Sequence, residues 1–251
     1  MIDYLIFFVV GLFFGSFLNV VIYRFPEMKD IILGRSYCPN CKKTLSAYDL
    51  IPFFSYIILA GKCRSCNKPI SIQYPIVEVV TGFLFALSYY ISGFSFSLFF
   101  YLPTFMLLVL IFVYDLKHLE IPETFSWLFL TFAILAGLYA GIYSVDSFLL
   151  GGLVGGGILG ILVGISDERW MGSGDIKIGL GFGFLLGYPS ALLFLFLSFV
   201  FGAVFGVVMI LVKKGKLKTQ IPFAPFLIIA AILTLLFGQK LIDLYLNFAI
   251  I

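Results

Sequence analysis

The sequence has few charged residues, and this shortage excludes most classes of soluble protein. Only 12% of the 251 residues are Asp, Glu, Lys or Arg, whereas about a quarter are charged in an ordinary globular domain. Hydrophobic residues make up 62%, and the mean hydropathy is +1.13. A chain of this composition cannot bury its apolar surface and still present a polar exterior. A soluble enzyme, a disordered chain and a nucleic-acid-binding protein are therefore excluded.

Histidine is almost absent, and so is any sign of a cleaved leader. His118 is the single histidine, so a serine–histidine triad would have to be built around it, and no nucleophile-elbow motif accompanies it. The amino terminus lacks the positive charges and the small-residue cleavage site of a secretory signal. We therefore expect the first apolar segment to be retained as a transmembrane helix.

What the sequence has in abundance is long apolar stretches, which predict an all-α polytopic membrane protein. At roughly 20 residues per crossing, the hydrophobic residues suffice for about seven or eight transmembrane helices. A shorter glycine-rich stretch, 174–187, is either an eighth helix or a re-entrant segment. The stretches long enough to span are 4–23, 75–93, 96–114, 124–143, 147–165, 189–212 and 222–247.

The positive charges predict how these helices are oriented. With eight helices, fifteen of the sixteen Lys and Arg residues fall on one side of the membrane, and only Lys240 is left over. Because cytoplasmic loops carry the excess of Lys and Arg, this side is expected to be cytoplasmic and both termini to lie outside. Seven helices would move the cluster Lys213–Lys218 to the other side, so the charges favour eight.

Residues 24–74 interrupt the apolar pattern with a polar, basic segment that holds all four cysteines. Some 50 residues are too few for a large core, so this segment needs a covalent or metal crosslink. Cys38 and Cys41, then Cys63 and Cys66, form two C-x2-C pairs with 21 residues between them. Four thiolates complete a closed tetrahedral zinc site. Disulfides or a redox pair are the alternative, which a reducing cytoplasm disfavours.

Three segments follow from these patterns. Residues 1–23 form the first transmembrane helix, 24–74 a cytoplasmic zinc-binding domain, and 75–251 the remaining membrane core. In helix 147–165, small residues recur every four positions, which predicts close helix packing. These residues are Gly152, Gly156, Gly160 and Gly164.

Two aspartates at predicted cytoplasmic helix ends are the candidate catalytic residues. Asp115 ends one helix, and Asp175 opens another after Gly172-Ser173-Gly174. Ionisable residues at a membrane edge usually have a function, and two facing carboxyl groups share one proton. Such a pair can hydrolyse a peptide bond by general acid–base catalysis without a metal. The alternative is that each aspartate only caps or anchors a helix end.

Taken together, these motifs resemble the prepilin peptidase family over nearly the whole chain. The match to the family's two catalytic aspartates falls on Asp115 and Asp175. One departure is Ala224, where the family's late motif leads us to expect Gly. The matching segments are Gly15–Val20, Arg24, Pro26, Arg35-Ser36, both cysteine pairs, Asp49–Pro52, Ser55, Ile70-Ser71, Tyr74-Pro75, Glu78, Ile121-Pro122 and Ile221–Phe226.

The resemblance implies an inner-membrane aspartic endopeptidase of the Gly-x-Gly-Asp type. Such an enzyme cuts the basic leader from prepilins or pseudopilins of pili or secretion systems, just before the substrate's hydrophobic helix. Members with the cysteine loop also methylate the new amino terminus with S-adenosylmethionine, whose binding site is not marked in the sequence. Glu78 and Asn19 match family motifs without an assigned role.

Two other functions compete with this one. A presenilin-like intramembrane protease also uses Tyr-Asp and Gly-x-Gly-Asp motifs, but the four-cysteine loop and Pro222-Phe223-Ala224-Pro225 in place of Pro-Ala-Leu argue against it. A membrane transporter with a zinc-binding loop would show internal repeats and midplane charges. We find no convincing repeat, and the ionisable residues gather at one face.

Overall fold

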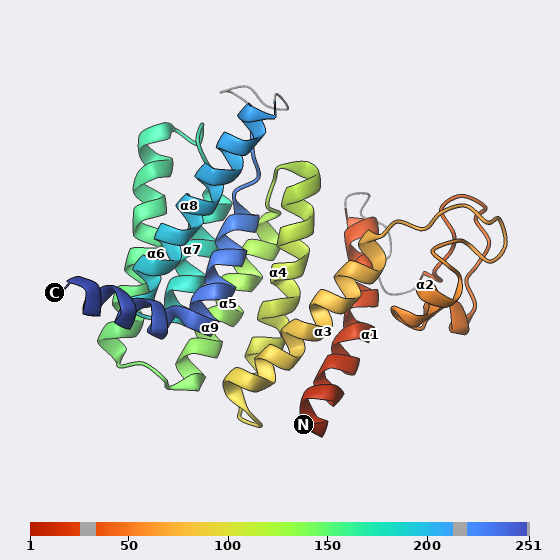
Figure 1. Cartoon of the computed structure of the whole chain (residues 1–251), viewed down its shortest axis with the longest axis horizontal. Coiled ribbons are helices and arrows are strands. Elements are labelled where there is room, and N and C mark those ends of the chain that lie inside the picture. The colour runs from red at the N-terminus through yellow and green to blue at the C-terminus, as the bar shows by residue number, and fades with distance from the viewer. Residues whose placement is uncertain (26–33, 213–219, 250–251) are drawn as a thin grey trace. The chain divides into compact units, whose positions relative to one another are not determined.

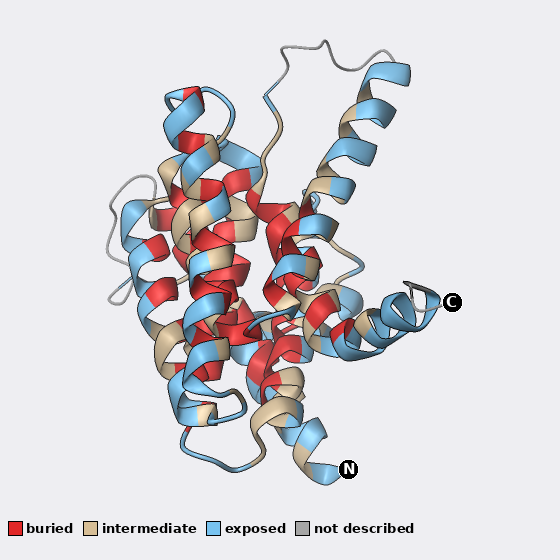
Figure 2. Cartoon of the chain, turned by 90° about the vertical axis from the view of Figure 1, so that its left-hand side faces the viewer, coloured by how far each residue is buried: buried red, intermediate tan, exposed pale blue. Residues whose placement is uncertain are grey.

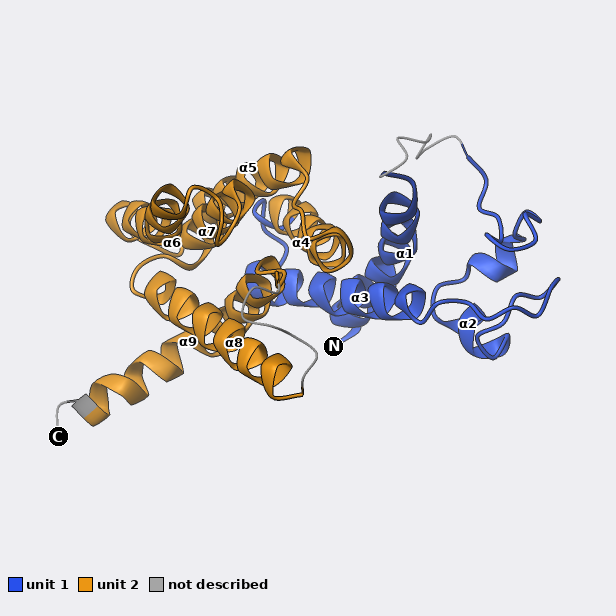
Figure 3. Ribbon diagram, turned by 90° about the horizontal axis from the view of Figure 1, so that it is seen from above, with its two compact units in different colours: residues 1–98 blue, residues 99–251 orange. Residues whose placement is uncertain are grey.

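The computed structural model is almost entirely helical and describes residues 1–25, 34–212 and 220–249 (Figure 1). No β-strand occurs among these residues. The chain divides into two compact units, residues 1–98 and 99–251, which are coloured separately in Figure 3. The elements are α1 (Ile2–Arg24), η2 (Ala47–Leu50), α2 (Phe54–Ile58), α3 (Gln73–Ser92), α4 (Leu98–His118), α5 (Glu123–Ala140), α6 (Val145–Ser166), α7 (Ser173–Leu186), α8 (Ser190–Leu211) and α9 (Ala224–Ala249).

The helical membrane architecture predicted from the sequence is confirmed. All eight apolar stretches are helices within a few residues of their expected bounds. Seven of them are long and apolar enough to cross a membrane. The exception is α7, whose 14 residues extend about 21 Å at 1.5 Å per residue, less than the ~30 Å of a bilayer's hydrocarbon core. The eight-crossing topology and the three-segment division of the chain stay predictions.

In the first unit, α1 and α3 form an antiparallel hairpin that close backbone contact holds together. A Cβ atom on Gly15 would lie 2.6 Å from the Cα of Glu78, so no larger residue fits there. Near the end that leads into the cysteine segment, the hairpin carries buried polar groups. Asn19 donates to the carbonyl oxygens of Gly15 and Tyr74 at 3.3 and 3.1 Å. These bonds give Asn19 a structural role in joining the two helices.

In the second unit, α6 and α7 approach backbone to backbone along a glycine face (Figure 1). The expected small-residue packing is confirmed for Gly152 and Gly156, which lie against the side chains of Phe184 and Leu180. It is wrong for Gly164, which has nothing within 4 Å of a Cβ. The closest backbone approach occurs one residue earlier in each turn, at Gly151 and Gly155. A sequence stripe specifies a helix face only to within about one residue, because neighbouring positions differ by 100°.

Buried positions gather on the sides of the helices that face each other, and the outer sides are exposed (Figure 2). Many of the exposed side chains are large and apolar, including Phe196, Val204 and Phe205 on α8. A bilayer would cover such a surface. Lys29 and the cluster Lys213–Lys218, on which part of the predicted orientation rests, lie outside the described residues.

Candidate active site and metal centre

The four cysteines lie on two similar turns in the first unit. Each C-x2-C pair is closed by an isolated β-bridge, Tyr37 with Thr44 and Lys62 with Pro69. In each turn the N–H of the first cysteine donates to a carbonyl five residues later, at 3.0 and 2.9 Å. The residue after the second cysteine, Lys42 or Asn67, has a left-handed backbone with φ of 57° or 55°. Repetition of one turn therefore brings both pairs of thiols to one point.

The geometry of the thiols fits a tetrahedral metal ion. All four sulfur atoms lie within 4.8 Å of one another, and the Sγ atoms of Cys38 and Cys66 are 3.9 Å apart. Four sulfurs at 2.3 Å from a zinc ion would be about 3.8 Å apart. The backbone N–H groups of Cys66 and Ser65 lower the pKa of the Cys63 thiol to about 6. This favours a thiolate, the form that binds a metal.

The fourth thiol shows the opposite effect. The N–H of Lys68 favours the thiolate of Cys66, but burial and the neighbouring thiols outweigh it and raise the pKa of Cys66 to about 11. One closely packed thiolate therefore opposes the ionisation of the next. Because a divalent cation removes this repulsion, the cluster is arranged for a metal rather than for four free thiols.

Hydrogen bonds hold the cysteine turns to the rest of the first unit. Asp49 accepts from the hydroxyl of Ser46 at 2.7 Å and from Nε of Arg64 at 2.8 Å, which joins η2 to the second turn. Ser46 first and Arg64 next hold the pKa of Asp49 below its usual value. Glu78 on α3 is buried and accepts the N–H of Phe53 at 2.7 Å. Glu78 thus anchors the cysteine segment to the membrane hairpin.

Asp115 lies in the last turn of α4 and is buried, with 4% of the residue exposed. Its Oδ2 atom accepts the backbone N–H of Ala224 at 3.1 Å. Ala224 is the first residue of α9, so the carboxyl group caps a helix that begins 109 residues later in the chain. The positive end of the α9 dipole favours a negative charge at this position.

Asp175 lies in the first turn of α7 and is 5% exposed. Its Oδ2 atom accepts the N–H of Gly172 at 3.2 Å, which caps its own helix. Its Oδ1 atom is buried and has no hydrogen-bond partner among the described residues. A purely structural role as a helix cap therefore accounts for the position of Oδ2 but not for the burial of Oδ1. A buried polar atom without a partner costs free energy and is typical of functional sites.

The structure brings the two aspartates together. Their carboxyl groups are close enough for a direct electrostatic interaction. The segment that follows α4 makes this approach possible, because Ile121 lies against Gly174. A Cβ atom on Gly174 would be 2.9 Å from the Cβ of Ile121, so the turn before Asp175 needs a glycine there.

A cation bridges α5 and α7 within one helical turn of Asp175. Lys177 forms an ion pair with Glu123 and lies over the ring of Trp127, with 5.0 Å from Nζ to the ring centroid. The lysine side chain is only 13% exposed, whereas that of Glu123 is 64% exposed. The sequence alone assigns no role to Lys177 or Glu123. His118, at the end of α4, is exposed.

Sequence reasoning also missed the N–H of Ala224, because a backbone donor leaves no residue-type signal. The motif Ile221–Phe226, which matches the family but has no assigned role, is the sequence feature that could have pointed to this segment. The contact also accounts for the departure at position 224, since Ala and Gly both supply the N–H that Asp115 accepts.

Comparisons with known proteins identify the family of the chain. Residues 9–92 match the bacterial peptidase A24 N-terminal domain, and residues 101–207 match the type IV leader peptidase family. The prepilin leader peptidase/N-methyltransferase of Bacillus subtilis (strain 168) is 35% identical over 98% of both chains. Proteins of the same name from Aeromonas hydrophila and Legionella pneumophila are each 30% identical over 96% of this chain and 92% and 94% of their own. No solved structure matches the chain significantly. From nearly full-length similarity at this level, we conclude that the chain belongs to the type IV leader peptidase family.

Proposed function

We propose that the protein is a membrane aspartic endopeptidase that removes the basic leader from prepilins or pseudopilins and then methylates the new amino-terminal residue. The observation that carries this proposal is the buried Asp115–Asp175 pair, in which Asp175 Oδ1 has no partner among the described residues. The family supports the substrate and the second activity. Zinc in the cysteine loop, S-adenosylmethionine as methyl donor and the cytoplasmic location of the site belong to the same proposal.

The hydrogen bonds give the two carboxyl groups different tasks. The N–H of Ala224, at the positive end of α9, stabilises a carboxylate at Asp115. At Asp175, a proton on the unpartnered Oδ1 avoids a bare buried charge. Asp115 is therefore the general base, and Asp175 is the general acid.

Hydrolysis then balances as follows. Asp115 takes a proton from a water molecule, whose oxygen attacks the carbonyl carbon of the scissile bond. Asp175 gives its proton to the carbonyl oxygen, which forms a neutral tetrahedral intermediate. As the C–N bond breaks, Asp115 returns its proton to the leaving amine, and one hydroxyl of the intermediate reprotonates Asp175. The glycines before Asp175 let a substrate backbone approach closely.

The position of the pair suits a substrate with a hydrophobic helix. Both aspartates occupy terminal turns, the last of α4 and the first of α7. A substrate helix in the bilayer would thus present the bond before its first turn to the pair, and its basic leader would project into the cytoplasm. A nucleic-acid partner has no place in this scheme.

The implied cofactors fit the chain unequally. The four thiols fit a zinc ion, with Cys38, Cys41, Cys63 and Cys66 as ligands and no open position for water, so the ion would be structural. For S-adenosylmethionine, the recess between α8 and α9 is lined only by apolar side chains and offers no partner for its charged groups. We therefore derive no step through the methyl donor.

Cleavage of a prepilin by the purified protein tests the proposal. Asp115→Asn and Asp175→Asn keep the shape of each side chain but remove its acid–base chemistry, so each should lower kcat at least about 10²–10⁴-fold. Glu120→Gln serves as the matched control, because it removes an exposed carboxylate from the segment after Asp115 and should cleave like wild type. Full activity in both aspartate variants would disprove the assigned pair.

A further inference from the structure

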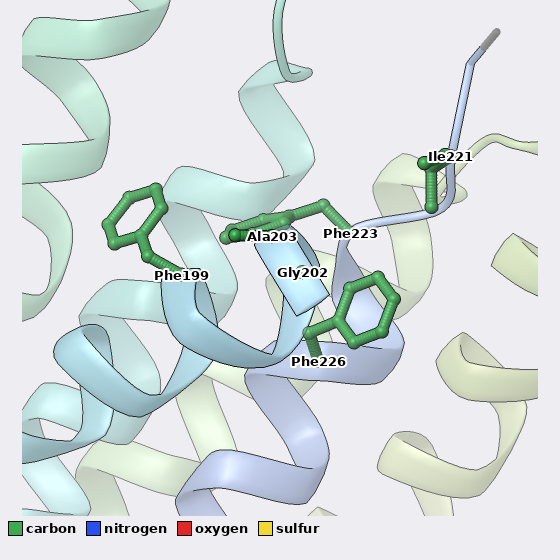
Figure 4. Close-up of a pocket in the computed structure, with 6 residues that line it drawn as sticks. All are labelled: Phe199, Gly202, Ala203, Ile221, Phe223 and Phe226. Carbon is green, nitrogen blue, oxygen red and sulfur yellow. The ribbon is translucent and has the colours of Figure 1, made fainter. Parts of the chain in front are cut away.

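An apolar recess lies between α8 and the start of α9, beside the segment that holds Asp115. Its volume is about 270 Å³, below the ~300–1,000 Å³ of pockets that enclose a whole small molecule. Figure 4 shows it between two groups of side chains, those of α8 and those of the chain around the start of α9. The lining residues are Phe199, Gly202, Ala203, Ile221, Phe223 and Phe226.

The recess exists because α8 carries small residues that helix packing does not use. A Cβ atom on Gly202 would lie 3.5 Å from the ring of Phe223 and 3.6 Å from that of Phe226, which are ordinary contact distances. A Cβ on Gly206 would come no closer than 3.7 Å to Ile221. In contrast, Gly183 faces the backbone of α6 so closely that a Cβ would clash. The glycines of α8 are thus not needed for close approach, and they leave space unfilled.

The chemistry of the recess favours an apolar side chain carried by another membrane helix. All six lining residues are apolar, so the recess offers nothing to the polar groups of a soluble ligand. The neighbouring side chains Val204, Phe205 and Val208 on α8 are exposed and would face lipid in a bilayer. An occupant would therefore arrive through the membrane rather than from water.

The recess adjoins the segment that holds the candidate general base. Ile221 and Phe223 line it, and the next residue, Ala224, donates its N–H to Asp115 at 3.1 Å. The short segment 221–224 therefore contributes two residues to the recess and one hydrogen-bond donor to the general base. Because an extended chain advances about 3.3–3.6 Å per residue, an occupant of the recess belongs to a residue within a few positions of the cleaved bond.

We infer that this recess binds one large apolar side chain from the start of the substrate's membrane helix and so fixes the position of the cleaved bond. This inference rests on the proposed function, since it assigns a subsite to the same peptidase site. The ring pair Phe199–Phe223, at 5.5 Å, and the ring of Phe226 form its walls. Gly202 forms its floor.

Filling the recess tests the inference. Gly202→Leu adds a branched side chain where a Cβ is tolerated, and leucine has the higher helix propensity, so α8 should still form. Gly164→Leu is the matched control, because the same change on α6 enters open space. Each variant is assayed with a prepilin series in which the first apolar residues after the cleaved bond are replaced by alanine one at a time.

For the wild type and Gly164→Leu, we expect one substrate position at which alanine lowers kcat/KM about 10–100-fold, the effect of losing one buried apolar side chain. Gly202→Leu should cleave the parent substrate about as poorly as the wild-type enzyme cleaves the alanine-substituted substrate. For Gly202→Leu, the ratio of kcat/KM between these two substrates should fall below about threefold. Wild-type cleavage by Gly202→Leu, or an equal loss for every substrate with the preference kept, would overturn the inference.

A second measurement does not depend on cleavage or on a substituted recess. A photoreactive benzophenone side chain is placed at the identified substrate position, or at each early apolar position in turn, and crosslinked to Asp115→Asn protein in liposomes. Crosslinks should map to residues 199–206 or 221–226, and crosslinks confined to other segments would reject the recess. If Asp115→Asn still cleaves, the proposed catalytic pair fails, whereas the crosslinks still decide about the recess.

Discussion

At the scale of single residues, a backbone group from a distant helix holds the candidate general base. The N–H of Ala224 is the group that Asp115 accepts, and both residues are buried. A hydrogen bond to a charged group contributes about 1.5–3 kcal/mol. Because Ala224 is the first residue of α9, proline is compatible with the helix backbone there, and its ring replaces the N–H with a carbon that faces Asp115.

We therefore expect Ala224→Pro to lower kcat about 10-fold or more, since Asp115 loses its hydrogen-bond partner and the proline ring displaces its carboxyl group. Ala224→Gly keeps the N–H and should stay within about threefold of wild type. Steady-state cleavage assays on both variants give the result. Equal activity of the proline and glycine variants would show that the hydrogen bond is unimportant.

The cysteine loop also gives a prediction at the scale of single residues. Backbone N–H groups lower the pKa of Cys63 to about 6, from a usual value near 8.5. A lowered pKa means that this thiolate stabilises the folded metal-free loop above the unfolded pKa, and the stabilisation fades as pH falls through about 6. Since Cys63 is already ionised at pH 7.5, zinc binding there should release fewer than four protons per ion, and the number should rise below pH 6.

Titration calorimetry in buffers of different ionisation enthalpy measures this proton release. The purified protein should contain about one zinc per chain, and Cys63→Ser should lose it, whereas Ser65→Ala between the two cysteines should keep it. Folded protein with four free thiols and no metal would contradict the zinc assignment.

How far the sequence predicts the site depends on the kind of group. Asp115, Asp175 and the four cysteines are recognisable because ionisable or metal-binding side chains are rare in so apolar a chain. The structure then brings the two carboxyl groups close to each other and, separately, gathers the four thiols into one cluster. The N–H of Ala224 and the empty side of Gly202 could not be predicted, because a backbone donor and a missing side chain depend on which segments meet.

At the scale of elements, α5 is fastened to the start of α7 at the level of the second aspartate. Lys177, two residues beyond Asp175, contacts both Glu123 and the ring of Trp127. Exposed ion pairs contribute about 0–1 kcal/mol, and a cation over an aromatic ring contributes a further ~0.5–2 kcal/mol. Because Lys177 takes part in both contacts and Glu123 in only one, the lysine is the more important member.

Lys177→Met should consequently lower kcat about 3–10-fold, because α7 loses both contacts that fix the turn carrying Asp175. Lys177→Arg retains a cation and should restore most of the activity, and Glu123→Gln should change it less than about threefold. Comparison of kcat with KM distinguishes misplacement of Asp175 from a loss of substrate binding. The prediction fails if the methionine and arginine variants are equally active.

The elements also show where sequence patterns reach their limit. Apolar length located the seven helices that are long enough to cross a membrane, because twenty consecutive apolar residues have few alternatives to a helix in a bilayer. The short pieces η2 and α2 in the cysteine segment were not predicted. They lack a periodic apolar face of useful length, and the metal turns and the Glu78–Phe53 bond fix them instead.

At the scale of the whole molecule, each of the two family models lies within one of the two compact units. The boundary at residues 98 and 99 falls between the matched ranges 9–92 and 101–207. All four cysteines belong to the first unit, and both aspartates belong to the second. Each of the two candidate sites is therefore built entirely from residues of one unit.

The orientation in the membrane is the remaining whole-molecule prediction, and it depends on α7. Although α7 extends only about 21 Å, its glycine face packs against the backbone of α6, and tilting or local thinning of the bilayer accommodates a short span. If α7 crosses, both termini lie outside, and the turn at Tyr188 lies on the same side as Ser144. If it is re-entrant, Tyr188 and the carboxyl terminus both lie inside.

Alkaline phosphatase fused after residue 188 or after residue 251 should be active, whereas a fusion after Lys117 should be inactive. Active fusions only at Ser144, with Tyr188 and the carboxyl terminus inactive, would refute the eight-helix topology and leave the positive charges of the α8–α9 connection on the opposite side from the cysteine loop.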